Sequence, residues 1–276
     1  MSDKTQPIHT RIWHEEPEAD NPFATRVARC HGYDVFGAML GRARWVDMLY
    51  LLLRGEAPGA QQADLLEALA VALANPGPRD ASVHAAMCGG VCGSTAASSL
   101  IAALGVGAGQ HTGAREVWLA MQGWLAAGSD VERWRGWRAS LDAPDAVAST
   151  WPRRAGSPGF DPHGVSTPTI VRQLLTHLAD RSPGGVLPWL REQSSALEQA
   201  AGAPLNIAGV AAAAFCDLGF DAQQGEMLFL LLRLPGAAAH ALEQAGYGHK
   251  RFPFYAIEIE NDPGPRVPAQ REAVAA

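Results

Sequence analysis

Apolar residues recur at helical spacing along most of the chain. Residues 45–53 (WVDMLYLLL) carry apolar side chains three and four positions apart, and the glycine and proline of RGEAP at 54–58 predict where that helix ends. The same pattern predicts helices at 61–73, 115–124, 168–179, 186–201, 207–218 and 222–244. No segment alternates apolar and polar residues over the length of a strand, so we expect little or no sheet and an all-α fold.

One stretch is long and uncharged enough to raise the question of a membrane span. Residues 85–110 contain no Asp, Glu, Lys or Arg, but Gly, Ala and Ser dominate and bulky apolar residues are few. Small residues, such as Gly89 and Gly93 four positions apart, suit helices whose backbones pack closely. We therefore predict one buried helix that ends at the glycine-rich residues 105–109 and packs against another helix or a partner subunit, with no membrane span.

Composition indicates an ordinary globular protein. Of the 276 residues, 47% are hydrophobic and 18% are charged, and the net charge of −6 gives no overall attraction to nucleic acid or to anionic membranes. The polar first residues lack an apolar leader, so we expect a cytoplasmic protein. We expect reduced thiols and no metal site, because the cysteines form no zinc-binding set: Cys30, Cys88, Cys92 and Cys216.

Short motifs follow one another in a specific order over residues 23–262. They are LYLLLRGEAP at 49–58, QHTGA at 110–114, LNIAG at 205–209 with FCD at 215–217, RLPG at 233–236 followed by His240 and Glu243, and KRFP at 250–253. Their order and spacing resemble the citrate synthase / citryl-CoA lyase superfamily. Without that resemblance, the residues indicate only a helical protein with a histidine in a glycine-rich turn.

The resemblance implies an all-α, citrate synthase-like fold in a homodimer. A large helical domain would span 23–122 and 202–262, with a smaller helical domain inserted at 123–201. The remaining segments would be an N-terminal tail at 1–22 and a disordered tail at 263–276, and residues 142–168, rich in Pro, Gly and Ser, would form a long loop.

The resemblance also implies an activity. Members make or break a carbon–carbon bond between an acyl-CoA and a 2-oxo acid such as oxaloacetate. The expected ligands are therefore an acyl-CoA and a di- or tricarboxylate. Coenzyme A enters as a substrate thioester, and no resident cofactor is expected.

Two active-site positions of the family can be compared directly with this sequence. His111 matches the family histidine that supports the thioester oxygen, in a turn whose glycines let backbone approach a ligand; the alternative is a loop histidine with a structural hydrogen bond. The family's carboxylate base aligns with Ala208, which has no titratable group. Asp217, further along the same helix, is interpreted as a structural residue.

Other family positions have changed as well. Asp161 and His163 lie where the family has "GFGH", and each is either a catalytic group or a solvated loop residue. The family's CoA-binding "DPR" is replaced by Ser, Thr and Pro at 166–168, and its substrate-facing "DHGP" by NPGP at 75–78. The last change removes a hydrogen-bond donor from the expected site.

Three residues are assigned to substrate binding by the resemblance. Arg233 matches a carboxylate-binding arginine, and Arg251 matches one that reaches the partner's site, although surface solubility is the alternative for Arg251. Asn206 belongs to the LNIAG motif. His240 and Glu243, one turn apart, are expected to form a structural pair.

Two main hypotheses follow, and a third is a changed reaction that needs no enolate. The chain is an active citryl-CoA lyase or citrate synthase-like enzyme with rearranged residues, or it is a catalytically degenerate homologue that acts as a binding or regulatory protein or a partner subunit. The loop at 156–169 separates them. An Asp161 that points toward His111 would favour activity.

Overall fold

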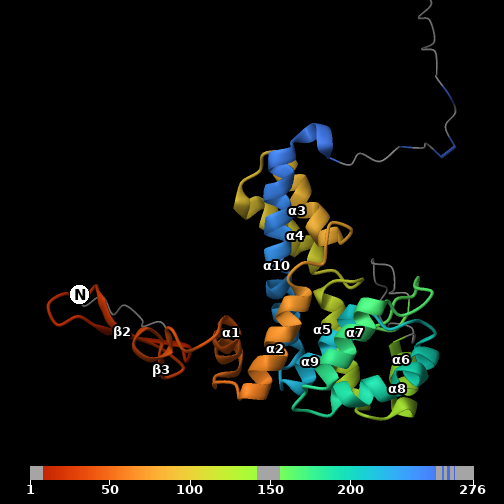
Figure 1. Cartoon of the computed structure of the whole chain (residues 1–276), viewed down its shortest axis with the longest axis horizontal. Helices are drawn as coiled ribbons and strands as arrows, with labels where there is room; N and C mark the ends of the chain where they lie inside the picture. The colour runs from red at the N-terminus through yellow and green to blue at the C-terminus, as the bar shows by residue number, and fades with distance from the viewer. Residues whose placement is uncertain (1–8, 142–155, 253–256, 258–259, 262–263, 265–276) are drawn as a thin grey trace, which may run out of the picture.

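The computed structural model describes residues 9–141, 156–252, 257, 260–261 and 264, and helices make up most of it (Figure 1). The helices before residue 142 are α1 (Trp45–Arg54), α2 (Ala60–Leu73), α3 (Ala81–Val91), α4 (Ala96–Gly107), α5 (Ala114–Ala127) and α6 (Val131–Leu141). Those after it are α7 (Thr169–Ala179), α8 (Val186–Ala201), α9 (Ile207–Asp217), α10 (Ala222–Tyr247) and the short 3-10 helix η2 (His249–Arg251). The predicted all-α fold is confirmed.

A small antiparallel sheet near the N-terminus is an addition to the prediction. Strand β1 (Trp13–Pro17) pairs with β2 (Thr25–Cys30), which pairs with β3 (Tyr33–Asp34), and a π-helix, η1 (Val35–Met39), follows. In Figure 1 this unit extends away from the helices. Strand β1 lies within the segment predicted as a tail. The apolar alternation is weak because only Ala28 and Cys30 of these strands are buried.

The stretch of small residues is two helices, so the prediction of a single helix is wrong. Helix α3 ends before Gly93, which has a φ of +71°, and Thr95 caps α4 by accepting a hydrogen bond from the Ser98 N–H at 3.2 Å. The two helices pack against each other and against α10. A side chain at Gly90 would collide with the Ala241 carbonyl of α10. Small residues therefore serve close helix packing, as predicted, and no helix among the described residues is long and apolar enough to span a membrane.

Helix α6 was not predicted from the sequence, although Val131, Trp134, Trp137 and Leu141 recur three and four positions apart along it. It is held by aromatic packing, because Trp134 stacks edge-on against Trp124 of α5 and against Trp137.

Helix α9 is almost entirely buried. Every residue from Ala208 to Phe215 is buried, so α9 forms the centre of the helical body.

One apolar cluster joins most of the helices. It runs from Val46 of α1 through Met121 of α5 and Leu190 of α8 to Phe229 of α10. The cluster includes residues from both the large and the small predicted domain, and the division between these domains remains a prediction. Predictions for 142–155 and for most of the C-terminal tail fall outside the described residues.

Candidate active site

A buried carboxylate connects the segments that carry the predicted site residues. Glu116, on the first turn of α5, is 1% exposed. One of its oxygens accepts hydrogen bonds from the Gly159 N–H and the Asn206 Nδ2, each at 2.9 Å. The other accepts one from the Thr112 N–H at 2.7 Å. The glycine-rich turn, the 156–164 loop and the start of α9 therefore meet at one side chain.

The glycine-rich turn presents His111 at the surface. His111 is exposed, and the next residue, Thr112, has a φ of +57°. Positive φ is unusual for a β-branched residue. Gly113 begins α5, and a side chain there would collide with the carbonyl of Gly109. The sequence correctly placed His111 in a tight turn.

Arg233 supports this turn from α10. It is 7% exposed, forms an ion pair with Asp80 and donates a hydrogen bond to the Thr112 carbonyl at 3.3 Å. Its guanidinium also lies 4.7 Å from the ring centroid of Phe229. Burial lowers the pKa of Arg233, and the nearby Asp80 carboxylate partly offsets that effect. The predicted buried pairing of Arg233 is found; its role as a substrate ligand remains a prediction.

The loop that carries Asp161 and His163 is attached to the start of α9. Phe160 forms a β-bridge with Leu205, and the Asp161 N–H donates to the Pro204 carbonyl at 2.8 Å. The Asp161 carboxylate accepts a hydrogen bond from the His163 N–H at 2.9 Å, which closes a local turn. Asp161 is half-buried and His163 is exposed.

The position of the family's base is closed to solvent. Ala208 is 1% exposed in the first turn of α9. Asn206 caps this helix, since its side-chain oxygen accepts a hydrogen bond from the Gly209 N–H at 3.0 Å. Asp217, at the other end of α9, accepts hydrogen bonds from the Val186 and Leu187 N–H groups at 2.8 and 2.9 Å, so it has the structural role expected of it.

The remaining predicted residues lie further along α10. His240 is 3.5 Å from Glu243, which fits the expected structural pair, and 3.2 Å from the Asn75 side chain. Arg251 follows the end of α10, exposed, with its guanidinium 5.5 Å from the Tyr247 ring centroid. At the rise of an α-helix, the stretch from Arg233 to Tyr247 is about 20 Å long. Arg233 and Arg251 of one chain are therefore well separated along the chain's last helices.

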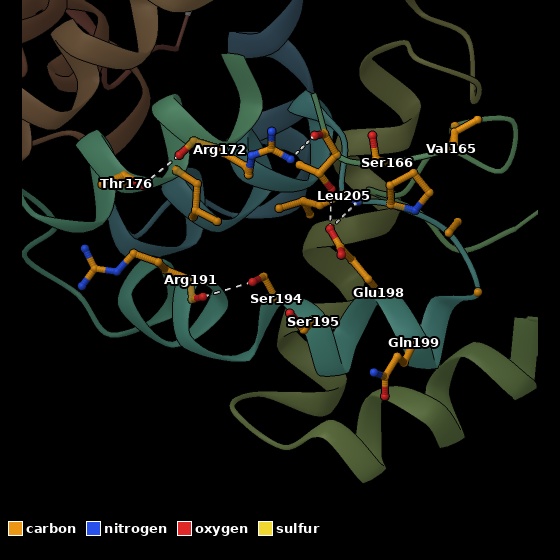
Figure 2. Close-up of a pocket in the computed structure, with 16 residues that line it drawn as sticks. Val165, Ser166, Arg172, Thr176, Arg191, Ser194, Ser195, Glu198, Gln199 and Leu205 are labelled. Carbon is orange, nitrogen blue, oxygen red and sulfur yellow. Dashed lines mark hydrogen bonds between the residues drawn. The ribbon is translucent and has the colours of Figure 1, made fainter. Parts of the chain in front are cut away.

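A groove of about 740 Å³ lies beside the 156–164 loop, between α7 and α8. Figure 2 shows Arg172, Arg191 and Glu198 along it. Arg172 donates a hydrogen bond to the Thr167 carbonyl at 2.6 Å, and Arg191 pairs with Asp180. The groove is lined by hydroxyl, amide and guanidinium groups, so it is suited to a polar ligand.

The structure thus brings together His111, Asn206, Arg233 and the start of the 156–164 loop. Among the described residues, no hydrogen bond or ion pair links Asp161 or His163 to His111. The sequence interpretation missed Glu116 and Asp80. Glu116 was recognisable as a charged residue within the apolar face of α5, four positions before Ala120.

The described residues also include the four cysteines and the potential metal ligands. Cys30, Cys88, Cys92 and Cys216 are all free, as expected. The described residues contain no group of three or more His, Cys, Asp or Glu side chains arranged to hold a metal ion.

The helices and the glycine-rich turn define an all-α scaffold, and comparison with known families identifies its family. The model of the citrate synthase C-terminal domain matches residues 19–253. The chain therefore belongs to the citrate synthase family. No curated protein matches it in sequence.

Solved structures agree on the fold. Citryl-CoA lyase from Hydrogenobacter thermophilus is similar with a TM-score of 0.71 at 18% identity, over 95% of this chain and 98% of that one. ATP citrate lyase from Methanothrix soehngenii, in complex with citrate and coenzyme A, has a TM-score of 0.69 at 18% identity, over 95% of this chain and 44% of that one.

A further similar structure is an ATP citrate lyase from Methanosaeta concilii, an aspartate-to-alanine variant in complex with (3S)-citryl-CoA. It has a TM-score of 0.68 at 18% identity, over 93% of this chain and 43% of that one. The chain thus spans less than half the length of these two ATP citrate lyases and nearly all of the citryl-CoA lyase.

Proposed function

We propose that the chain is a citryl-CoA lyase-like enzyme that cleaves or forms a carbon–carbon bond between an acyl-CoA and an oxaloacetate-like 2-oxo acid. The observation that supports this most strongly is the joint attachment of three family motifs to Glu116. Thr112, Gly159 and Asn206 all donate to this carboxylate, and the arrangement leaves His111 exposed in the turn.

The two directions use the same proton transfers in opposite order. Condensation requires a fixed base to remove a weakly acidic proton beside the thioester, and Ala208 supplies none. Cleavage removes the proton from the hydroxyl of a citryl thioester and breaks the bond to the α-carbon. The electron pair forms an enolate, which takes a proton from water. Because the two directions share their transition states, Ala208 removes the family's base from condensation and the corresponding acid from cleavage, and it does not select a direction.

Each proposed role falls to a residue of the site. His111 donates a hydrogen bond to the thioester oxygen as it becomes the enolate oxygen. Asp161 and His163 are the titratable groups that the 156–164 loop offers for the hydroxyl proton. The groove with Arg172 and Arg191 has the volume and polarity to receive part of the coenzyme.

We further propose that the working form is a homodimer. Arg251 resembles an arginine that serves the partner's site, and it is well separated from Arg233 of its own chain along the last helices. A second copy would bring Arg251 to the site that surrounds His111 in the first.

A second candidate function is a non-catalytic binding protein or a partner subunit of a competent relative. Ala208 favours this candidate, because a buried methyl group occupies the position of the family's base and supplies no carboxylate. Ligand binding is common to both candidates, and turnover separates them. The Methanosaeta concilii relative, an aspartate-to-alanine variant, is in complex with (3S)-citryl-CoA.

The first experiment is calorimetric titration with CoA, acetyl-CoA, oxaloacetate and citrate, alone and in pairs, followed by an assay of citryl-CoA cleavage. We expect CoA and citrate to bind together and citryl-CoA to be cleaved. Binding without turnover would favour the non-catalytic candidate. An absence of binding to every ligand would overturn the enzymatic proposal and leave a non-catalytic partner subunit, or a protein for a ligand outside this set.

His111→Ala tests the site itself. Loss of an enolate-stabilising donor is expected to lower kcat by about 10²–10³-fold, while folding and dimerisation stay intact because His111 is exposed. His177→Ala, which removes an exposed histidine from α7, is the matched control and should leave turnover unchanged. Equal turnover in His111→Ala and the wild type would exclude His111 from the chemistry.

A further inference from the structure

We propose that Glu116 and Arg233 are positioning residues that fix His111 by gripping the backbone of Thr112 from both sides. This inference rests on the proposed function for its catalytic meaning. The geometry itself stands apart from any ligand. It also gives Arg233 a task that differs from binding a substrate carboxylate.

The contacts lie on the two peptide units that flank Thr112. Its N–H, in the peptide unit that also contains the His111 carbonyl, donates to Glu116 at 2.7 Å. Its carbonyl, in the unit that leads to Gly113, accepts from Arg233 at 3.3 Å. Both gripping side chains are buried, one at 1% and the other at 7% exposure. Because peptide units are planar and a buried side chain holds each of these two, the backbone next to His111 has little rotational freedom.

The conformation of Thr112 needs such a grip. A φ of +57° is costly for a β-branched residue, on the order of 1–2 kcal/mol, and it persists only where the surroundings impose it. Glycine would adopt this conformation freely, and threonine does not. In this chain the buried pair Glu116 and Arg233 holds the turn despite the threonine side chain.

A carboxylate is required at position 116. Three N–H groups point at its oxygens, from Thr112, Gly159 and Asn206. A glutamine has one acceptor oxygen, and its amide nitrogen is a donor. If the oxygen of a substituted glutamine served Gly159 and Asn206, its NH₂ would face the Thr112 N–H, and the grip on the turn would open.

The test uses Glu116→Gln in the full chain with Asp217→Asn as a matched control. Asp217 is also a carboxylate that accepts three hydrogen bonds, from Ser182, Val186 and Leu187, but these lie at the other end of α9. We expect both variants to be less stable. Only Glu116→Gln should lower kcat, by at least about tenfold. An equal fall in kcat in both variants would reduce Glu116 to a general structural role.

Thr112→Gly provides the rescue. Glycine needs no support at positive φ, so Glu116→Gln should cost much less kcat in the Thr112→Gly background than in the wild type. An undiminished loss in the double variant would refute the proposal that strain at Thr112 is what the grip controls.

Arg233→Lys tests the other side and covers the case in which Glu116→Gln does not fold. An ammonium can keep the ion pair with Asp80, but it lacks the second arm that reaches the Thr112 carbonyl. A positioning role predicts a lower kcat with little change in the KM for the carboxylate substrate. A raised KM with unchanged kcat would assign Arg233 to substrate binding instead.

Amide hydrogen exchange separates this inference from the proposed function. Glu116→Gln should speed exchange at Thr112, whereas Asp217→Asn should not, and neither result needs a substrate. If the wild type has no turnover while this difference is seen, the proposed function fails and the grip stands. Unchanged protection of Thr112 in Glu116→Gln would overturn the grip whatever the activity.

Discussion

The ion pair between Asp80 and Arg233 offers the sharpest test of how the site is held. Asp80 begins α3, where one of its oxygens accepts a hydrogen bond from the Ser82 N–H at 3.0 Å and the other pairs with Arg233. The side chains of the pair are 16% and 8% exposed. Asp80→Asn keeps an oxygen for the helix cap and removes the charge that compensates the buried guanidinium.

The size of the effect follows from that loss. Removing one partner of a buried ion pair costs about 3–5 kcal/mol, because the remaining charge has no partner. Since the cap survives and Asp80 is partly exposed, we expect the lower end, about 3 kcal/mol. With an unfolding entropy of about 2.1 cal/mol/K per residue, a chain of 276 residues would lose about 5 °C in Tm.

The measurement is thermal and urea unfolding of Asp80→Asn beside Asp64→Asn. Asp64 also pairs with an arginine, Arg44 at 2.7 Å, but its side chain is 61% exposed. Exposed pairs contribute little, so Asp64→Asn should change the free energy of unfolding by about 0.5 kcal/mol or less. The argument is refuted if Asp80→Asn costs no more than Asp64→Asn.

Two further variants probe the packing around the site. Gly159→Ala should cost about 2 kcal/mol or more in free energy of unfolding, because Gly159 has a φ of +87° and a Cβ there would lie 2.8 Å from the Gly209 Cα. Cys216→Ala should flatten the loss of stability at high pH. Burial, with a smaller contribution from Asp217, raises the pKa of the Cys216 thiol from 9.0 to about 12. Between these values only the unfolded chain releases this proton, so wild-type stability falls by about 1.4 kcal/mol per pH unit.

Each of these variants has its own control. Gly105→Ala, at an exposed helical site with open space around it, should gain about 0.5–1 kcal/mol. A loss there equal to that of Gly159→Ala would mean that backbone crowding is not the cause. For Cys216→Ala, the comparison is urea unfolding of the variant and the wild type at about pH 8 and about pH 10. Parallel losses in wild type and Cys216→Ala would show that the Cys216 proton does not contribute.

The helices were largely predictable because their periodicity is local. Residues 186–201 form α8 as the pattern predicted, and α9 and α10 begin at the predicted residues or next to them. Helix α6 was missed because four charged residues lie between and around its tryptophans, and the packing of Trp134 on Trp124 that stabilises it is a contact with the preceding helix. The break between α3 and α4 was missed because Gly93 stands in a run already rich in glycine, where one glycine at positive φ gives no distinct pattern.

The site was predictable only in part, because its organisation depends on contacts between distant residues. Motif order identified His111, Asn206 and Arg233 as members of one site. The contacts that join them connect Glu116 to Gly159 and to Asn206, which are 43 and 90 residues away. A single sequence contains no information on which buried carboxylate will accept those hydrogen bonds.

The charged groups around the turn explain how the scaffold persists without the family's base. Glu116 and Arg233 are buried and bound to backbone groups of the turn or the loops, and Asp80 compensates the one positive charge. The charges at the centre of the site therefore stabilise the fold even where no substrate is bound. Loss of a carboxylate at Ala208 leaves this network untouched, since Ala208 packs into the apolar first turn of α9. In the proposed function, substrate chemistry depends on the exposed His111, and this network binds the backbone next to it without a hydrogen bond to its ring among the described residues.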